Sequence, residues 1–155
     1  MEKVVILYNI RSAHNVGSIF RTCDGAGVSK IYLAGYTPAP IDRFGRVQSE
    51  IEKTSLGAIL NVAWETIKKP EGLFDRLRNK GFQIVSVEQH SGSVSLHDFK
   101  PNQKTVYIFG NEIDGVSDGI CKESDVILEI PMHGKKESLN VGVSAGIVLF
   151  HQSPK

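Results

Sequence analysis

The sequence has little of what marks metal-binding and disulfide-stabilised proteins. It holds only two cysteines, Cys23 and Cys121, which lie far apart and form no CxxC pair. We expect both to be reduced, structural thiols. The histidines are scattered, and no cysteine and histidine cluster has the spacing of zinc ligands. We therefore expect no metal site.

Long apolar runs and a strong charge of one sign are absent too. The first apolar run, residues 4–7, is far too short to span a membrane, and no signal-peptide cleavage pattern accompanies it. We therefore expect a cytoplasmic protein with no membrane contact. The formal net charge is +1, which does not by itself indicate a nucleic-acid binder.

Nucleotide fingerprints are missing as well. No GxGxxG follows the first apolar run and no GxxxxGK[ST] occurs, so the phosphate cradles of dinucleotide-binding and P-loop folds are lacking. Residues 142–146 match GxSxG, but no acidic residue follows them, as a hydrolase nucleophile elbow would require. A NAD-type oxidoreductase and a hydrolase are therefore disfavoured.

What is present is an alternation of short β-rich runs with helical patterns, in a chain of 155 residues that is 41% hydrophobic. Nearly continuous apolar strands between helices predict a parallel sheet covered on both faces. We expect strands near Val4–Tyr8, Lys30–Ala34, Gln83–Val87, Val106–Phe109 and Val126–Ile130. The expected helices lie near Asn15–Gly25, Glu71–Lys80, Ser117–Cys121 and Leu139–Phe150, and Gly35–Gly45 is expected to be an exposed loop.

Residues 9–21, NIRSAHNVGSIFR, directly follow the first expected strand. Open parallel sheets bind ligands at the carboxyl ends of their strands. Asn15 could simply cap the helix. Arg21 is either a solvated surface residue or a guanidinium held over a site, where its planar fork suits a phosphate.

Residues 109–116, FGNEIDGV, follow another expected strand. Gly110 allows a ligand or another backbone to approach closely. Glu112 and Asp114 beside Gly115 could form nothing more than a tight turn. A turn does not require an Asn-Glu pair at the end of a strand, so a binding role stays open beside it.

Residues 130–134, IPMHG, and Ser138-Leu139-Asn140 precede an apolar helix. Ser138 is a good candidate for the N-cap of that helix. Gly142 and Gly146 lie inside it, and each glycine costs about 1 kcal/mol relative to alanine. This cost predicts that another backbone packs very closely there, within the fold or across a dimer.

Together and in this order, the three segments resemble the three motifs of the SpoU/TrmH family of SPOUT methyltransferases. The stretches that carry the resemblance are NIRSAHNVGSIFRTCDGAGV, IFGNEIDGVS and IPMHGKKESLNVGVSAGIVLF. Any one would be weak, but three in order are specific. The resemblance implies an α/β fold with a mostly parallel sheet and helices on both faces. It also implies a C-terminal deep trefoil knot, and a homodimer whose active site lies near the subunit interface.

By the same resemblance, the chain would transfer a methyl group from S-adenosyl-L-methionine (SAM) to a ribose 2′-hydroxyl of RNA. Arg21 looks like the catalytic arginine, acting on the hydroxyl or through the neighbouring phosphate, and Asn15 would position it. Glu112, Ser138 and Asn140 would orient the substrate and SAM. The residues implied in SAM binding are Val87, Glu88, Gly110, Ile130, Met132, Ser138 and Leu139.

The RNA surface is expected to draw on bunched positive charges, Arg11, Arg43, Arg46 and Lys135, although these could equally be solvated surface. The length resembles the small tRNA-modifying members, so tRNA is favoured over rRNA. We expect one domain over residues 1–155 with no appended RNA-binding domain. Two alternatives stay open. One is a base-methylating enzyme like the tRNA guanine-N1 branch; the other is a non-catalytic RNA-binding protein on the same fold.

Overall fold

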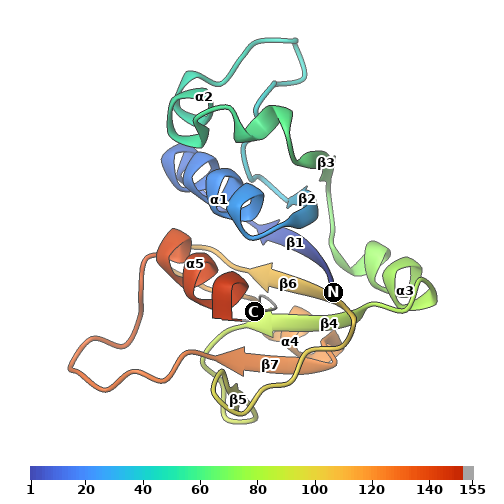
Figure 1. Ribbon diagram of the computed structural model, residues 1–155, viewed down its shortest axis with the longest axis vertical. Helices are drawn as coiled ribbons and strands as arrows, with labels where there is room; N and C mark the ends of the chain where they lie inside the picture. Colours follow the sequence, from blue (N-terminus) through green and yellow to red (C-terminus); the bar gives the residue numbers. More distant parts are fainter. Residues whose placement is uncertain (152–155) are drawn as a thin grey trace.

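Seven strands form one parallel sheet in the order β3-β2-β1-β6-β4-β7-β5. The computed structural model in which we describe them covers residues 1–151. The strands are β1 Glu2–Tyr8, β2 Val28–Ala34, β3 Ala63–Ile67, β4 Gln83–Val87, β5 Val94–Ser95, β6 Lys104–Phe109 and β7 Val126–Glu129. Because every pair is parallel, the carboxyl ends of the strands all lie at one edge of the sheet (Figure 1).

Helices cover both faces of this sheet (Figure 1). Val5 and Leu7 of β1 belong to one core, which α1 and α5 complete, whereas Val4 and Ile6 belong to a second core completed by α3 and α4. The alternation follows from the two-residue period of a strand. The helices are α1 Ala13–Gly25, α2 Ser49–Ser55, the 3₁₀ helix η1 Ala58–Leu60, α3 Glu71–Asn79, α4 Asp118–Glu123 and α5 Val141–His151. The expected α/β class is confirmed.

All five expected strands and four expected helices are present within about two residues of their predicted bounds. The sequence reading missed β3, β5, α2 and η1. Edge strand β3 has no fully buried position, and β5 has only two residues. Helix α2 is charged and buries only Ile51 and Ser55, so its apolar pattern is too sparse to stand out.

Both expected helix caps were assigned to the wrong residue. Ser12, not Asn15, caps α1: its hydroxyl accepts a hydrogen bond from the backbone N–H of Asn15 at 3.2 Å. Helix α5 begins at Val141, too late for Ser138 to cap it. Asn140 does so, since its Oδ1 accepts from the backbone N–H groups of Gly142 at 2.8 Å and Val143 at 3.3 Å.

The loop expected at Gly35–Gly45 is only partly exposed. Thr37 is buried, and its hydroxyl accepts from the Ile10 N–H at 3.0 Å and lies within hydrogen-bond distance of the Leu7 and Ala34 carbonyls. The base of the loop is therefore fixed to the end of β1. Its outer part, from Ile41 onward, is at the surface.

The close backbone packing expected at Gly142 and Gly146 is not found within the described residues. A Cβ added at Gly142 would meet Asn140 Oδ1 at 3.1 Å and Ser18 at 3.9 Å, and one at Gly146 would meet Thr22 at 4.0 Å. All three neighbours are side-chain atoms, and the tight one is the oxygen that caps α5. The cap therefore gives a reason for Gly142 within the described residues, whereas Gly146 has no tight neighbour there.

Both cysteines are buried and free, as expected, and burial raises the pKa of each thiol. Between residues 1 and 151, no helix has both the length and the apolar character needed to cross a membrane.

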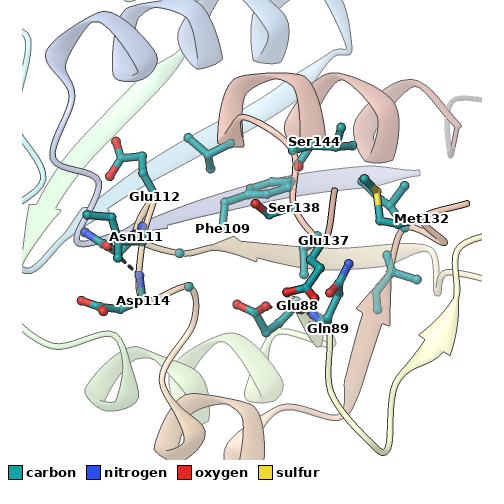
Figure 2. Close-up of a pocket in the computed structure, with 18 residues that line it drawn as sticks. Glu88, Gln89, Phe109, Asn111, Glu112, Asp114, Met132, Glu137, Ser138 and Ser144 are labelled. Atoms are coloured by element: carbon teal, nitrogen blue, oxygen red, sulfur yellow. Dashed lines mark hydrogen bonds between the residues drawn. The ribbon is translucent and has the colours of Figure 1, made fainter. Parts of the chain in front are cut away.

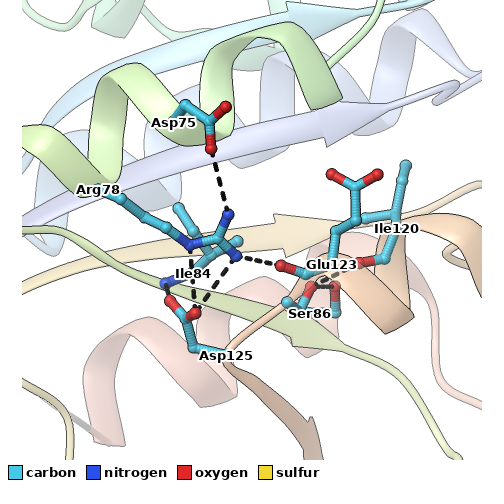
Figure 3. A network of polar contacts seen from close by, with 8 residues as sticks. Asp75, Arg78, Ile84, Ser86, Ile120, Glu123 and Asp125 are labelled. Atoms are coloured by element: carbon cyan, nitrogen blue, oxygen red, sulfur yellow. Dashed lines mark hydrogen bonds and ion pairs between the residues drawn. The ribbon is translucent and has the colours of Figure 1, made fainter.

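Arg78 of α3 connects three segments on the sheet face that α3 and α4 cover (Figure 3). Its guanidinium donates to the Asp125 carboxylate at 3.2 Å and to the Glu123 carbonyl. The other oxygen of Asp125 accepts from the Ile84 N–H at 2.7 Å. Arg78 therefore joins α3 to the turn between α4 and β7 and, through Asp125, to β4.

We predict that Arg78→Ala lowers the free energy of unfolding by about 2 kcal/mol, because a hydrogen bond to a charged group contributes about that much. Urea denaturation measures the change. Arg76→Ala is the matched control. Arg76 lies on the same helix, and among residues 1–151 its one ion pair is with Glu65 at 3.8 Å. Such exposed pairs contribute about 0.5 kcal/mol. Equal losses in the two variants would contradict the assignment.

Candidate active site at the carboxyl edge of the sheet

The ends of three neighbouring strands bring distant segments together. Strand β6 pairs with β1 on one side and with β4 on the other, all in parallel. The residues that follow these strands, 9–12, 110–116 and 88–89, therefore emerge at the same edge. This is the edge where open parallel sheets bind ligands.

The carboxylate of Glu112 holds the start of α1. Oε2 accepts from the Arg11 N–H at 3.0 Å, and Oε1 accepts from the Ser12 N–H at 3.0 Å and from Asn15 Nδ2 at 3.2 Å. A negative charge at this end of a helix is also favoured by the helix dipole. Glu112 therefore does more than close a turn.

These contacts fix the charge state of Glu112. Burial pushes its pKa upward, but the hydrogen bonds from the Arg11 and Ser12 N–H groups, from its own N–H and from Asn15 outweigh this. The net effect holds the pKa of Glu112 below its ordinary value. The group is therefore ionised at neutral pH and is a weak proton acceptor.

Asn15 links Glu112 to the C-terminal motif by hydrogen bonds. Its Nδ2 donates to Glu112, and its Oδ1 accepts from Asn140 Nδ2 at 3.2 Å. Asn140 in turn caps α5. One chain of hydrogen bonds thus runs through Glu112, Asn15 and Asn140, which come from the three sequence motifs.

The turn after β6 is closed by Asn111. Its Oδ1 accepts from the N–H groups of Ile113 and Asp114, and its Nδ2 donates to the Asn9 carbonyl at 2.9 Å and the Tyr36 hydroxyl at 2.8 Å. The expected tight turn is therefore real. The residue that builds it is Asn111, while Glu112 points back to α1.

Two glycines allow this turn. A Cβ added at Gly110 would lie 2.2 Å from the Gly115 backbone, so the expected close backbone approach is confirmed. Gly115 has a φ of +66°, and a Cβ there would lie 1.9 Å from the Glu88 carboxylate. That carboxylate accepts from the Val116 N–H at 2.8 Å. Glu88 thereby fixes the turn from the side of β4.

A cavity of about 200 Å³ lies beside this turn (Figure 2). All seven residues expected to bind SAM line it, and so does Glu112. The lining residues that sequence reasoning missed are Gln89, Phe109, Asn111, Ile113, Asp114, Gly115, Leu128, Glu137, Val141 and Ser144. Most are chain neighbours of expected residues, so adjacency was the signal that could have found them.

The charged side chains that line the cavity are all acidic among the residues described. Its lining includes four carboxylates, Glu88, Glu112, Asp114 and Glu137, and no lysine or arginine among the residues described. The rest of the wall is largely apolar, with Val87, Ile130 and Leu139 among its members. Such a cavity suits a ligand that combines an apolar ring system with positive charge.

The remaining expected residues lie outside the cavity. Arg21 is exposed on α1, and within the described chain it does not line the cavity. Arg11 binds Glu112 through its backbone, with its side chain exposed. Lys135 is exposed between β7 and α5, and Arg43 and Arg46 are exposed on the loop after β2. No three histidine, cysteine or acidic residues between 1 and 151 are placed to hold a metal ion.

The fold and the site are those of an open parallel α/β protein with a ligand cavity at the carboxyl ends of its strands. Comparison with known proteins identifies the family. The SpoU rRNA Methylase family matches residues 2–150. The chain therefore belongs to that family. This confirms the resemblance seen in the three motifs.

One curated relative and two solved structures are similar to this chain. The tRNA (guanosine(18)-2'-O)-methyltransferase of Aquifex aeolicus is 34% identical over 147 residues, which are 95% of this chain and 66% of that protein. A crystal structure of an AdoMet-bound rRNA methyltransferase from Sinorhizobium meliloti is 29% identical with a TM-score of 0.87, covering 97% of this chain and 55% of the other. The A. aeolicus TrmH/SpoU tRNA modifying enzyme is 32% identical with a TM-score of 0.81, covering 97% and 73%.

The chain spans between about half and two thirds of the length of the curated relatives it matches. The match lies over the sheet, the turn after β6 and helix α5. The trefoil knot and the single domain over 1–155 stay predictions, and residues 152–155 lie outside the described part of the chain.

We predict that Glu112→Gln lowers the free energy of unfolding at neutral pH by about 1 kcal/mol. The effect is small because solvent screens the exposed carboxylate. The folded-state pKa of Glu112 is lowered, so its contribution is fully present above the unfolded value of about 4.3 and is lost as the pH falls through the folded value. Urea denaturation at a series of pH values should show wild type and variant converging below about pH 4.

Asp114→Asn is the matched control, since the Asp114 side chain accepts no hydrogen bond among the described residues. Its stability difference from wild type should be small at every pH. A gap between wild type and Glu112→Gln that persisted into strong acid would show that the charge of Glu112 is not what stabilises the site.

Proposed function

We propose that this chain is a SAM-dependent RNA methyltransferase that modifies a ribose 2′-hydroxyl, with tRNA as the first candidate and rRNA as the alternative. The observation that carries the proposal is the acidic, apolar-walled cavity at the strand ends, bordered by the hydrogen-bonded Glu112, Asn15 and Asn140. The name of the A. aeolicus relative, a tRNA guanosine 2'-O-methyltransferase, supports ribose chemistry and tRNA.

The cavity fits SAM in two respects. Val87, Ile130 and Leu139 offer an apolar wall for a purine ring, and the four carboxylates favour a molecule that carries a sulfonium and an ammonium group. When bound, SAM supplies a methyl group activated by its positively charged sulfur. An AdoMet-bound structure exists for the similar S. meliloti protein.

The remaining chemistry falls to the protein and the RNA. As the ribose oxygen bonds to the methyl carbon and the carbon–sulfur bond breaks, the hydroxyl proton must leave. Glu112 is a poor acceptor for that proton, because hydrogen bonds hold its charge. We assign Glu112 and Asn15 to positioning the bound molecules. Ser138 contacts those molecules at the cavity wall, and Arg21 acts on the ribose hydroxyl or the neighbouring phosphate. Placement of the reactants then supplies much of the rate.

We also propose a homodimer that forms through α5. Val143, Ile147 and Phe150 form an exposed apolar face on this helix, and single domains rarely leave such a face uncovered. Gly146, which has no tight neighbour among the described residues, would let a second subunit approach closely. Arg21, on the neighbouring helix α1, would then reach the cavity of the partner subunit. The dimer is proposed to work in the cytoplasm.

Methyl transfer tests the proposal directly. The chain and labelled SAM are incubated with total tRNA in one reaction and with rRNA in another. The product RNA of each reaction is then digested to nucleosides. We expect label in 2′-O-methyl nucleosides, and the RNA pool that carries it names the substrate class. Label in a methylated base would favour the guanine-N1 type of enzyme instead. RNA binding with no label and no SAM binding would favour the non-catalytic alternative.

Complementation tests the shared site. We predict that Arg21→Ala and Ser138→Ala each lose methyl transfer, whereas Arg21→Ala keeps its affinity for SAM in calorimetry. If Arg21 acts in the partner's cavity, mixing and reassociating the two variants restores about a quarter of wild-type activity, because half of the dimers are mixed and each has one intact site of two. An inactive mixture would place Arg21 in the site of its own subunit, and loss of SAM affinity in Arg21→Ala would contradict its assigned role.

A further inference from the structure

The loop between β2 and α2 ends in an ordered tip. Ile41 and Val47 pair as an antiparallel bridge, which brings residues 42–46 into a short turn. Asp42 organises this turn: its Oδ1 accepts from the N–H groups of Phe44 at 2.8 Å and Arg46 at 2.9 Å, and its Oδ2 accepts from Arg46 Nε at 2.8 Å. The backbone hydrogen bond from Arg46 is foremost in holding the pKa of Asp42 below its ordinary value, so the carboxylate is charged at neutral pH.

An aromatic ring lies exposed at this tip. Phe44 is 66% exposed, while five other phenylalanines are buried in the two cores: Phe20, Phe74, Phe82, Phe99 and Phe109. The ring of Phe44 is therefore available for contact with another molecule. Phe150 is also exposed, but it shares the apolar face of α5. Phe44 has a different setting.

That setting is cationic. The guanidinium carbons of Arg43 and Arg46 lie 4.7 Å and 5.0 Å from the centre of the Phe44 ring. Within residues 1–151, Arg43 forms no ion pair, and Arg46 pairs only with Asp42. The tip therefore carries two guanidinium planes and one aromatic plane with a net positive charge. Nucleobases stack on both kinds of plane, and the guanidinium fork also binds phosphate.

The loop is anchored at the proposed active site. At its start, the Tyr36 hydroxyl accepts a hydrogen bond from Asn111, and the Tyr36 N–H donates to Asn9. After the tip, α2 packs on the first turns of α1, where the Thr54 hydroxyl donates to the His14 carbonyl at 3.1 Å. The start and the end of the loop are thus held by residues that adjoin the site, while the tip extends beyond α2 (Figure 1).

We propose that Arg43, Phe44 and Arg46 form a subsite for an unpaired nucleotide of the RNA substrate. The base stacks on the Phe44 ring and a guanidinium plane, and a guanidinium binds the phosphate of the same nucleotide or its neighbour. The subsite selects single-stranded or looped RNA, because a base inside a duplex cannot expose its face to the ring. This inference rests on the proposed function, since it takes RNA as the substrate.

Fluorescence anisotropy tests the subsite without methyl transfer. The probes are a labelled single-stranded RNA of roughly 12 nucleotides, near the span of one single-strand site, and the same strand annealed to its complement. We expect wild type to prefer the single strand. Phe44→Ala should weaken single-strand binding about tenfold, because one stacked base contributes on the order of 1–3 kcal/mol.

Three further variants separate stacking from other causes. Phe44→Tyr keeps the ring and should bind like wild type, while Phe44→Leu keeps apolar surface without a π face and should behave like Phe44→Ala. Leu60→Ala removes an 86% exposed apolar side chain on η1 and should leave RNA affinity unchanged. Replacing both arginines with glutamine should reduce the slope of log affinity against log salt by about 0.7 for each RNA phosphate that an arginine neutralises in the wild type.

Each contrary outcome has a distinct meaning. Wild-type RNA affinity in Phe44→Leu would overturn stacking, because an apolar side chain without a π face would then be sufficient. An altered sedimentation coefficient in Phe44→Ala, with unchanged RNA affinity, would assign the tip to the subunit interface and overturn the subsite. If the tip variants bind RNA normally while wild type methylates RNA, the subsite is wrong and the proposed function stands. If wild type transfers no methyl group but Phe44→Ala still loses RNA affinity, the subsite stands and the proposed function is wrong.

Discussion

The site depends on one ionised carboxylate that satisfies the start of a helix. The first N–H groups of α1 have no partners within the helix, and Glu112 accepts from the backbone of Arg11 and Ser12 just ahead of it. The same group orients Asn15, which orients Asn140, which caps α5. Two helices and the turn after β6 are therefore placed relative to one another by a single hydrogen-bonded chain. Loss of the charge would loosen all three at once.

The cavity beside this chain exists because the backbone is unusually close there. Gly110 lets the Gly115–Val116 backbone fold back over the end of β6, and Gly115 leaves room for the Glu88 carboxylate. Any side chain at either position would push the turn away from β4. The turn beside the cavity is thus set by the placement of the backbone.

Charge is segregated in a chain whose net charge is only +1. The cavity gathers four carboxylates, which suits a cationic methyl donor, whereas the tip of the loop after β2 gathers two guanidinium groups around Phe44, which suits an anionic polymer. The separation matters because opposite charges in one place would pair with each other. Two ligands of opposite sign can then be attracted to different parts of one molecule.

The sequence by itself determined the elements whose burial repeats locally: β4 has its predicted bounds, and the alternation in β1 follows from two covered faces. Its three motifs indicated the family, and through that resemblance the seven cavity residues. Tertiary structure alone decided the place of the edge strand β3 and the hydrogen-bonded chain of Glu112, Asn15 and Asn140. The physical reason is range. Periodicity reports which face of an element is buried, whereas the contact between Glu112 and Ser12 spans 100 residues and forms only when parallel strands end together.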